Sequence, residues 1–440
     1  MPDRGIEDRA LNEPPRREPA VTVERLVVVG ASLAGLRAVE AARKTGFEGT
    51  ITLIGAEPHL PYDRPPLSKE FLGASEPGSE SPIPFFRSDD VFANELRVDL
   101  LLGAPATGLD TTRKVVLLGD REIGYDAVII ATGSQLRTLP GTEHLDGVHG
   151  LRTLDDSLAI RAALDAGART VVIGAGFIGS EVASSAQKRG VDVTVVEALP
   201  TPLVRATGTV MGAAIASLHD RNGTTLLCGT EVEAVEGDGH VERVVLSDGT
   251  VIAADLVIVG IGVTPCTNWL EDSGLALDNG VLCDETLWTG IPGVYAAGDV
   301  ANWLNPMFGV RQRMENWTAA AEQGAAAARN ALDPDNAKPY ETVPYFWSDW
   351  YGSRIQFVGV PESDEVLLVD GDVDGDDRWT ALYRHGDQLV GALTVNGQTV
   401  IMKYRRMIAQ RTSWSEALEF AAKRRGAALA KAAATDSGVS

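Results

Sequence analysis

The stretch LVVVGASLAG, residues 26–35, decides the fold of the N-terminal part of this chain. Its apolar run, 26–29, predicts a buried strand that ends at Gly30, and the small residues beyond it open a helix. Gly30 and Gly35 occupy the first and third positions of the GxGxxG pattern, where they allow a tight turn and close packing of helix on strand. Ser32 takes the middle position, where it is small enough for a pyrophosphate to approach and adds a hydroxyl donor.

A second strand and an acidic residue extend this pattern into a βαβ unit. Residues 50–54 form another apolar run, and Glu57 follows where such a fold places the carboxylate that accepts hydrogen bonds from an adenosine ribose. Glu57 is therefore the candidate ribose ligand. The alternative is a plain βαβ unit in which the glycine pair is accidental.

A complete GxGxxG pattern occurs again in the middle of the chain. Residues 170–173 predict a strand, Gly174, Gly176 and Gly179 complete the pattern, and a helix is predicted from residue 180 to about residue 189. Two such units in one chain imply two bound nucleotides.

The acidic residue of the second unit bears on the choice of nucleotide. A further strand ends at Glu197, at the spacing of the carboxylate that reads the ribose. Its negative charge should repel a 2′-phosphate, which favours NADH over NADPH. Arg205, a little downstream, is the one residue that argues for NADPH.

Length, composition and charge exclude several classes of protein. At 440 residues the chain should form two or three domains. No apolar run reaches the roughly 20 residues that span a bilayer, and the net charge of -22 argues against general nucleic-acid binding, which needs clustered cations. The first 20 residues are rich in Arg, Glu and Pro and lack a signal peptide's apolar core. They predict a disordered arm on a cytoplasmic protein.

The three cysteines indicate neither a metal site nor a disulfide framework. Cys228, Cys266 and Cys283 are widely spaced, with no CxxC motif and no paired histidine. We interpret them as reduced structural thiols.

A proline-rich segment follows the first βαβ unit. PYDRPPLSKEFL, residues 61–72, predicts a rigid loop that presents Arg64 and Lys69 before a helix begins near Ser68. Taken alone, the segment is more typical of a proline-punctuated turn with solvated charges.

Two further strands are predicted to end in small residues, where a ligand can approach the backbone. The sequence ATG, residues 131–133, closes one strand, and GVYAAGD, residues 293–299, closes the other and adds Asp299. The Asp299 carboxylate would suit the hydroxyls of a sugar-like chain, although an aspartate at such a position is often a helix cap.

The chain changes character after Pro344. Aromatic residues crowd positions 345–351, and strand-like runs follow, interrupted by an acidic turn over residues 362–377. This pattern predicts a smaller α+β domain, with the aromatic residues in its core more often than against a cofactor. The basic residues beyond it form either a solvated helical face or a docking patch: Lys403, Arg405, Arg406, Arg411, Lys423, Arg424, Arg425 and Lys431.

The motifs GASLAG, PYDRPPLSK, ATG, GAGFIGSE, GIGVTP, YAAGD, ENW and YFWSD occur here in one order. Over about residues 24–425 the chain resembles the FAD-dependent ferredoxin reductases that serve Rieske oxygenases and bacterial cytochromes P450. The resemblance implies an α/β fold with two Rossmann-like nucleotide-binding domains, as in glutathione-reductase-like flavoproteins, and a C-terminal α+β domain. The implied division is a disordered arm (1–22), a discontinuous FAD-binding domain (23–133 and 265–340), an inserted NAD-binding domain (134–264), a C-terminal domain (341–430) and a tail (431–440).

The resemblance also implies which side chains hold the cofactors. Lys69 and Glu181 correspond to a catalytic pair near the nicotinamide, placing compensating charges where the flavin gains and loses negative charge. The alternative is an ordinary salt bridge between domains. NADH would be held by Gly174, Gly176, Gly179 and Glu197. The residues implied at FAD are Gly30, Ser32, Gly35, Glu57, Arg64, Lys69, Ala106, Thr132, Gly133, Asp299 and Trp317.

By this resemblance the chain is an oxidoreductase that passes electrons from NADH through FAD to a small ferredoxin of the [2Fe-2S] type, which in turn supplies an oxygenase. A monomer is expected, with no metal site and no nucleic-acid or membrane partner. The chain departs from the family pattern at Ser32, in place of a glycine, and at Trp350, where relatives often carry a glutamine. The departures predict altered contacts around the flavin ring or the partner face.

Two other functions are weighed against this one. An NADH oxidase, peroxidase or disulfide reductase would place a redox cysteine on the loop where this chain has Ser68. A non-catalytic, NADH-sensing flavoprotein, similar to apoptosis-inducing factors, would change conformation on binding NADH and turn over slowly.

Overall fold

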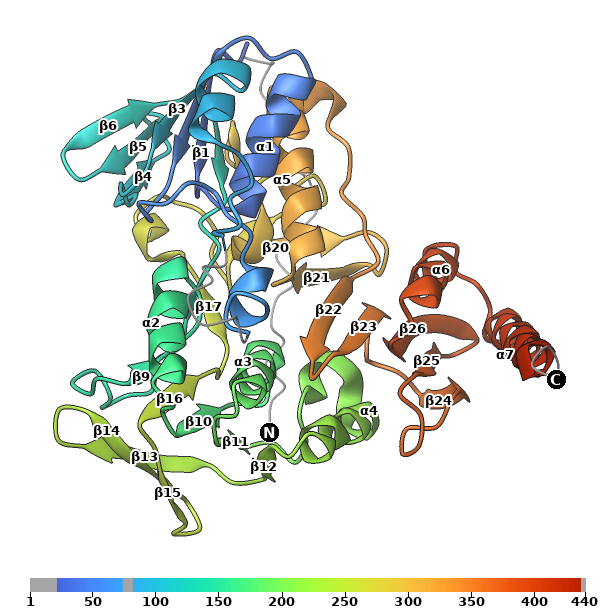
Figure 1. Cartoon of the computed structure of the whole chain (residues 1–440). Coiled ribbons are helices and arrows are strands. Elements are labelled where there is room, and N and C mark those ends of the chain that lie inside the picture. Colours follow the sequence, from blue (N-terminus) through green and yellow to red (C-terminus); the bar gives the residue numbers. More distant parts are fainter. Residues whose placement is uncertain (1–21, 74–81, 437–440) are drawn as a thin grey trace, which may run out of the picture.

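The chain folds into three lobes (Figure 1). The computed structural model describes residues 22–73 and 82–436. The arm expected over residues 1–22 therefore lies outside the described residues, apart from its last residue. Within the two described ranges, no helix is both long enough and apolar enough to cross a membrane.

The first lobe is built on a five-stranded parallel sheet of order β19-β7-β1-β2-β3. The apolar run 26–29 forms most of β1 and is fully buried, as predicted, and the run 50–54 is β2 beside it. Helices α1 and α5 pack against each other beside this sheet (Figure 1). The bounds are β1 Arg25–Val29, β2 Thr50–Ile54, β3 Val98–Leu101, β7 Ala127–Ile130, β19 Val294–Ala296, α1 Leu33–Lys44 and α5 Trp317–Leu332.

Two three-stranded sheets and several short helices complete this lobe. The sheets have the orders β4-β5-β6 and β18-β20-β21. Their strands are β4 Gly108–Asp110, β5 Val115–Leu118, β6 Arg121–Gly124, β18 Val281–Cys283, β20 Ala301–Asn305 and β21 Val310–Arg313. The short helices are η1 Pro65–Ser68, η2 Val91–Glu95, η3 Asn268–Leu270, η4 Gly298–Val300 and η5 Pro334–Asn336.

The second lobe repeats the plan with a parallel sheet of order β12-β11-β10-β16-β9. Its glycine turn joins β10 to α3, and α3 begins at Phe177, three residues before the predicted start, because Gly176 already serves as its N-cap. An antiparallel sheet, β13-β14-β15, projects from this lobe (Figure 1). The bounds are β9 Val148–His149, β10 Thr170–Ile173, β11 Val193–Glu197, β12 Thr225–Cys228, β13 Val232–Gly237, β14 Val241–Leu246, β15 Val251–Ala253, β16 Leu256–Val259, α2 Leu154–Asp165, α3 Phe177–Lys188 and α4 Val204–Arg221.

The two lobes are joined by a pair of crossing segments. Strand β8, Ser134–Leu136, leaves the first lobe and pairs antiparallel with β17, Val263–Pro265, which returns to it. The whole second sheet is formed between these two strands. On this topology we propose domain boundaries near residues 133 and 265.

The third lobe is an antiparallel sheet of order β22-β23-β26-β25-β24 with two helices. The acidic turn predicted over residues 362–377 is partly wrong, because its apolar core VLLV pairs with β25 as the edge strand β24. The bounds are β22 Tyr345–Trp350, β23 Ser353–Gly359, β24 Glu365–Asp370, β25 Trp379–His385, β26 Gln388–Val395, α6 Gln398–Ala409 and α7 Trp414–Asp436.

Two smaller expectations also need correction. The helix expected to begin near Ser68 instead ends there, as the single 3-10 turn η1, because Pro65 and Pro66 lack N–H groups and suit only the first turn of a helix. The boundary expected at residue 430 falls inside α7, which continues to Asp436.

Replacing Gly179 by alanine should destabilise the second lobe. The added Cβ would lie 2.1 Å from the carbonyl oxygen of Gly174, so α3 would have to move away from β10. We expect the free energy of unfolding to fall by about 1–3 kcal/mol, measured by urea denaturation. Gly176→Ala is the matched control, because its Cβ would meet nothing closer than the Gly260 oxygen at 3.9 Å. Equal losses in the two variants would contradict the packing role of Gly179.

Candidate active site

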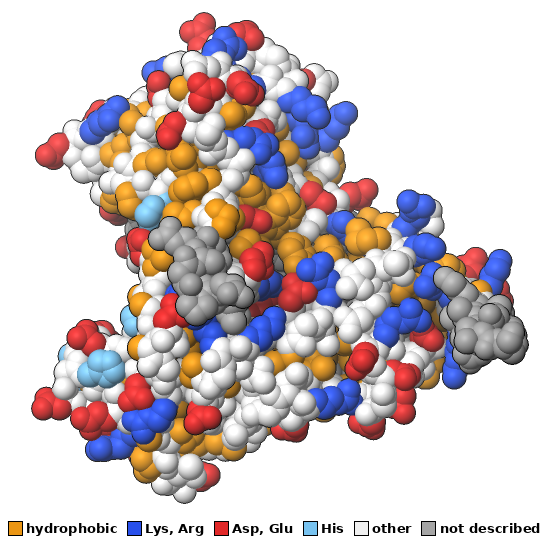
Figure 2. All heavy atoms as spheres, viewed as in Figure 1, with side chains coloured by type: hydrophobic (Ala, Val, Ile, Leu, Met, Phe, Trp, Pro, Cys, Tyr) orange, Lys and Arg blue, Asp and Glu red, His pale blue; other side chains and the backbone are white. Residues whose placement is uncertain are grey.

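One cavity of about 1780 Å³ lies between the three lobes. It is lined by both glycine turns and by strands of the third lobe, and it is larger than the roughly 300–1000 Å³ of a typical single-ligand pocket. In Figure 2 hydrophobic side chains gather along the hollow between the upper and lower lobes. Every site residue predicted from sequence lines this cavity except Gly35 and Gly179. Those two glycines pack their helices against their strands, which is the role that the pattern gives the third position.

The first glycine turn presents backbone donors to the cavity. Gly30 has φ 120°, and a Cβ there would lie 2.0 Å from the carbonyl oxygen of Ala131, so only glycine fits. Ser32 is the N-cap of α1 but makes no capping hydrogen bond with its side chain. The first N–H groups of α1 are therefore left for an anion, which the helix dipole also favours.

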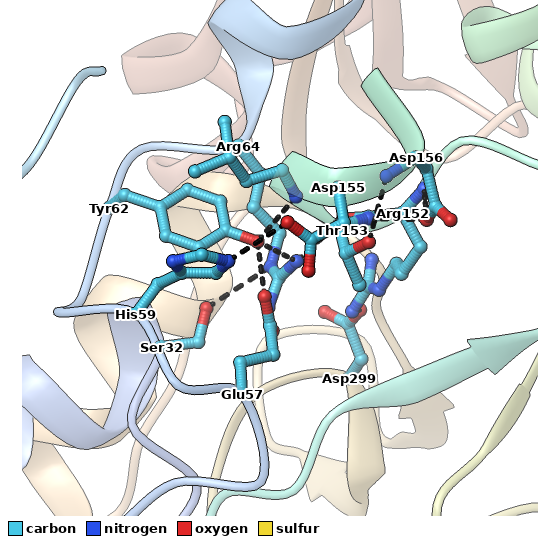
Figure 3. A network of polar contacts seen from close by, with 11 residues as sticks. Ser32, Glu57, His59, Tyr62, Arg64, Arg152, Thr153, Asp155, Asp156 and Asp299 are labelled. Carbon is cyan, nitrogen blue, oxygen red and sulfur yellow. Dashed lines mark hydrogen bonds and ion pairs between the residues drawn. The ribbon is translucent and has the colours of Figure 1, made fainter. Parts of the chain in front are cut away.

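Glu57 sits in a dense polar network at this end of the cavity (Figure 3). The Tyr62 hydroxyl donates to Glu57 Oε2 at 2.5 Å, and Arg64 Nη2 donates to Glu57 Oε1 at 2.5 Å. Arg64 Nε also reaches Ser32 Oγ at 3.3 Å. Burial, opposed by the charge of Arg64, raises the pKa of Tyr62 above its ordinary value, so the phenol remains a donor.

Arg152 belongs to the site although it was not predicted from sequence. Its Nη2 donates to Asp299 Oδ2 at 2.9 Å (Figure 3). The Ser134 hydroxyl donates to the same oxygen at 2.8 Å. Arg152 stands directly before the N-cap of α2, where Thr153 and Asp156 form a capping box. The capping box could have indicated Arg152 from the sequence, because it fixes the start of the helix and the backbone directly before it.

The second glycine turn holds Glu197 close to its backbone. Glu197 Oε2 accepts from the N–H of Ala175 at 2.8 Å, and Oε1 accepts from the N–H of Leu199 at 2.9 Å. Arg205, at the start of α4 in the same lobe, also lines the cavity. The second lobe therefore contributes to the cavity wall both the carboxylate that favours NADH and the guanidinium that favours NADPH.

The predicted pair of Lys69 and Glu181 is confirmed as an ion pair, with Nζ and Oε2 2.7 Å apart. Glu181 is only 2% exposed, and the hydroxyls of Ser68 and Ser348 each donate to its carboxylate at 2.5 Å. The N–H of Asp349 is a further donor at 3.3 Å. A buried carboxylate needs such partners because the loss of its hydration costs several kcal/mol. Ser348 was missed from sequence because it lies 167 positions from Glu181.

The aromatic segment 345–351 divides between cavity and core. Trp350 is fully buried and does not line the cavity, whereas Phe346 and Trp347 do. Trp350 Nε1 donates to Ser348 Oγ at 2.8 Å, so this departure from the family pattern affects the packing between lobes and not the cavity wall. The prediction of a core role thus applies to only part of the segment.

Trp317 lies at the cavity edge beside Trp347. The two rings form an edge-to-face pair with centroids 6.3 Å apart, and Trp317 Nε1 donates to Asp63 Oδ1 at 2.8 Å. Burial is the largest of the effects that raise the pKa of Asp63 above its ordinary value.

The cysteines and the other metal-ligating side chains in the described part of the chain form no metal-binding group. Within residues 22–73 and 82–436, no group of three or more His, Cys, Asp or Glu side chains could hold a metal ion. Cys228, Cys266 and Cys283 are unpaired, and burial raises the pKa of each thiol. Cys266 lines the cavity, but a raised pKa is the opposite of what a reactive thiol requires.

The donor set of the first lobe fits FAD. Uncapped helix N–H groups with Arg64 and Arg152 suit a pyrophosphate, while the carboxylates of Glu57 and Asp299 suit ribose and sugar-chain hydroxyls. The second glycine turn offers a similar but smaller set of groups: the uncapped N–H groups that follow the N-cap Gly176, for phosphate, and the Glu197 carboxylate, for a ribose.

Comparisons with known proteins agree with this assignment. The family model of pyridine nucleotide-disulphide oxidoreductases matches residues 24–324, and a reductase C-terminal model matches residues 345–423. Rhodocoxin reductase of Rhodococcus erythropolis is 36% identical, over 87% of this chain and 89% of that protein. The ferredoxin–NAD(+) reductase component of the anthranilate 1,2-dioxygenase system of Burkholderia cepacia is also 36% identical, over 88% of this chain and 95% of that protein. A solved covalent complex of putidaredoxin reductase with putidaredoxin superimposes with a TM-score of 0.82 at 32% identity, covering 88% of this chain and 93% of that chain.

Removing the cation from the buried ion pair should destabilise the protein. In Lys69→Met, Glu181 would be left buried with no opposite charge, and we expect the free energy of unfolding to fall by about 3 kcal/mol. The double variant Lys69→Met/Glu181→Gln should recover most of that loss, because it leaves no charge buried. Urea denaturation measures both.

The exposed pair of Arg243 and Glu236 provides the control for this experiment. Arg243→Met should cost no more than about 1 kcal/mol, because both partners are hydrated. If the double variant proved as unstable as Lys69→Met, the loss would come from packing and not from an unpaired charge.

Proposed function

We propose that this chain, which belongs to the pyridine nucleotide-disulphide oxidoreductase family, passes electrons from NADH through bound FAD to a small iron–sulfur ferredoxin. The ferredoxin, expected to be of the [2Fe-2S] type, would supply an oxygenase of the cytochrome P450 or Rieske class. The observation that carries the proposal is that two dinucleotide half-sites open into one cavity, with the ion pair of Lys69 and Glu181 also in its lining. The names of the relatives support the choice of ferredoxin as acceptor.

The first lobe would hold FAD. When bound, FAD supplies the conversion of a two-electron hydride donor into single-electron transfers. The α1 N-terminus and Arg64 would neutralise its phosphates, and Glu57 and Asp299 would orient its hydroxyl groups. The residues proposed to hold or border it are Gly30, Ser32, Gly35, Glu57, Arg64, Lys69, Ala106, Thr132, Gly133, Arg152, Asp299 and Trp317.

The second lobe would hold NADH through Gly174, Gly176 and Glu197, with Gly179 fixing the helix behind them. The Glu197 carboxylate is already fixed by two backbone donors, so it is oriented before a ribose binds. Its fixed charge supports the preference for NADH, while Arg205 is the group that could soften that preference.

Lys69 and Glu181 are the proposed catalytic pair. Lys69 holds a positive charge in the wall of the cavity, and the Glu181 carboxylate fixes the ammonium group there. A charge oriented in advance needs no rearrangement when negative charge develops nearby, which is how such groups accelerate reactions. The three unpaired cysteines support a reducing compartment, so we propose a cytoplasmic location.

Anaerobic mixing with NADH and, separately, with NADPH tests the proposed reaction. We expect rapid bleaching of the flavin by NADH, much slower bleaching by NADPH, and reduction of cytochrome c that requires an added [2Fe-2S] ferredoxin. Stopped-flow absorbance measures each step. Slow reduction with every acceptor and a long-lived reduced flavin would instead indicate an NADH-sensing flavoprotein. Rapid consumption of oxygen or of disulfides without ferredoxin would indicate an oxidase or a disulfide reductase.

The structure divides the basic C-terminal residues into two groups. Helix α6 packs on β23 and β26 and exposes Lys403 and Arg406. Strand β23 is the neighbour of β22, which lines the cavity, so α6 lies toward the cavity half of the sheet. Helix α7 packs on the opposite edge strand, β24, and lies at the end of the third lobe away from β22 in Figure 1. An acidic ferredoxin is therefore proposed to dock along α6.

Arg405 does not belong to this docking group. Its Nε donates to the carbonyl oxygen of Val343 at 2.9 Å, and its Nη2 donates to Thr342 Oγ1 at 2.9 Å. The side chain is thus a link between α6 and the segment before β22, and reversing its charge would disturb the fold.

Reversing the charge of Arg406 should raise the KM for ferredoxin at low salt, because rim charges mainly set the rate of association. In Arg406→Glu we expect a rise of about 3- to 10-fold that disappears at high salt. Arg425→Glu, on α7, removes the same charge far from the cavity and should leave the KM unchanged. Steady-state reduction of cytochrome c through ferredoxin measures both KM values. A rise in KM for Arg425→Glu alone would indicate that ferredoxin docks on α7 and not on α6.

A further inference from the structure

A stack of four aromatic rings connects the second glycine turn to the interior of the third lobe. Phe177, the first residue of α3, packs on Phe346 of β22 with centroids 4.6 Å apart, and Phe346 stacks on Phe357 of β23 at 5.4 Å. Phe357 meets the edge of Tyr383, on β25, at 5.2 Å. The interior of the third lobe is therefore connected, through these packed rings, to the NADH half of the cavity.

The last ring of the stack makes a hydrogen bond back to the second lobe. Tyr383 is 0% exposed, and its hydroxyl donates to the carbonyl oxygen of Thr207 at 2.6 Å. Thr207 is the fourth residue of α4 and is itself fully buried. Burial raises the pKa of Tyr383 above its ordinary value, so its hydroxyl stays protonated and donates.

The acceptor carbonyl lies at an interruption of α4. Gly208 has φ 76° and ψ 165°, far from helical values, so the helical hydrogen-bond pattern is broken directly after Thr207. A buried carbonyl next to such a break needs a partner from elsewhere. Leu203, at the N-cap, has φ 55°, which is rare for a branched side chain and persists only where the surroundings hold it.

The segment held in this way forms part of the cavity wall. Residues 203–206 line the cavity, as does Glu197, and both belong to the second lobe. The far end of α4 is also fixed by the third lobe, since His219 Nδ1 lies 2.9 Å from the Tyr351 hydroxyl and Arg221 Nη2 donates to the Val373 carbonyl oxygen at 2.6 Å. The third lobe thus fixes α4 along its length, and Tyr383 is its contact nearest to the cavity.

We propose that Tyr383 is a positioning residue for NADH: by holding the interrupted turn of α4 it sets residues 203–206 against the nucleotide. The proposal rests on the function proposed above. It makes the third lobe a part of the NADH site in addition to any role in docking a partner. Tyr383 does not line the cavity, so it acts through α4 and not by direct contact with the nucleotide. Tyr383→Phe keeps the ring that packs on Phe357 and removes only the hydrogen bond to α4.

The test compares Tyr383→Phe with the unmodified, FAD-loaded enzyme. Loss of one buried hydrogen bond should weaken the Kd for NAD⁺ about fivefold, measured by calorimetry on the oxidised protein. The KM for NADH should rise by a similar factor, while kcat at saturating NADH stays within about twofold. Amide hydrogen exchange over residues 203–212 should become faster. An unchanged Kd would overturn the proposal.

Two further variants separate positioning from general damage. Tyr404→Phe removes the hydroxyl of another buried tyrosine in the third lobe, on α6 and outside the cavity lining, and should leave the Kd unchanged. Gly208→Ala disfavours the positive φ of the interrupted turn and should weaken the Kd as Tyr383→Phe does. Because both changes act on one contact, their combination should not be additive. Full additivity, or an equal loss in Tyr404→Phe, would overturn the proposal.

These readouts also distinguish the proposal from the function on which it rests. If NADH failed to reduce the flavin of the unmodified enzyme, the proposed function would fall. The calorimetric comparison of Kd values would still report on Tyr383 alone.

Discussion

The buried carboxylate of Glu181 is the constraint on which the arrangement of the lobes depends. A carboxylate with 2% exposure is tolerable only with a full set of donors, and here they come from separate parts of the chain. Lys69 and Ser68 belong to the loop after β2, Glu181 itself to α3, and Ser348 to β22. Separating any lobe from the others would expose the Glu181 carboxylate or remove one of its partners. The ion pair therefore also helps to fix the shape of the cavity.

The cavity follows from the way in which two parallel sheets end. In each of the first two lobes a buried strand ends at a glycine with positive φ. A helix then starts at the same edge of the sheet, with no side-chain cap on its first N–H groups. Positive charge is concentrated locally in a chain of net charge -22, because Arg64, Arg152 and Lys69 all line the one cavity. Each of these cations is already paired with a carboxylate, which orients it without a large net charge.

The third lobe takes part in the site as well as covering it. Its strand β22 supplies Ser348 to the ion pair and Trp347 to the cavity edge, and the same lobe contacts α4 through Tyr383, Tyr351 and Val373. A hydrophobic cluster that includes Ile215 of α4 and Phe357 of β23 covers the junction. Such packing joins α4 of the second lobe directly to the sheet of the third lobe.

The sequence by itself determined the features that depend on short-range pattern. Strand β1, both glycine turns, Glu57 and Glu197 follow from hydrophobic runs and fixed spacings, because a strand, a turn and a helix start are decided by neighbouring residues. The pair of Lys69 and Glu181 came from the resemblance, and the structure confirmed it. Tertiary structure alone decided the parts whose partners are distant in sequence. Arg152 meets Asp299 only once the first two lobes have packed together. Ser348 contacts Glu181 across 167 sequence positions, and Tyr383 contacts Thr207 across 176. Local patterns carry no information about such contacts, since burial and desolvation select them only after the elements have packed.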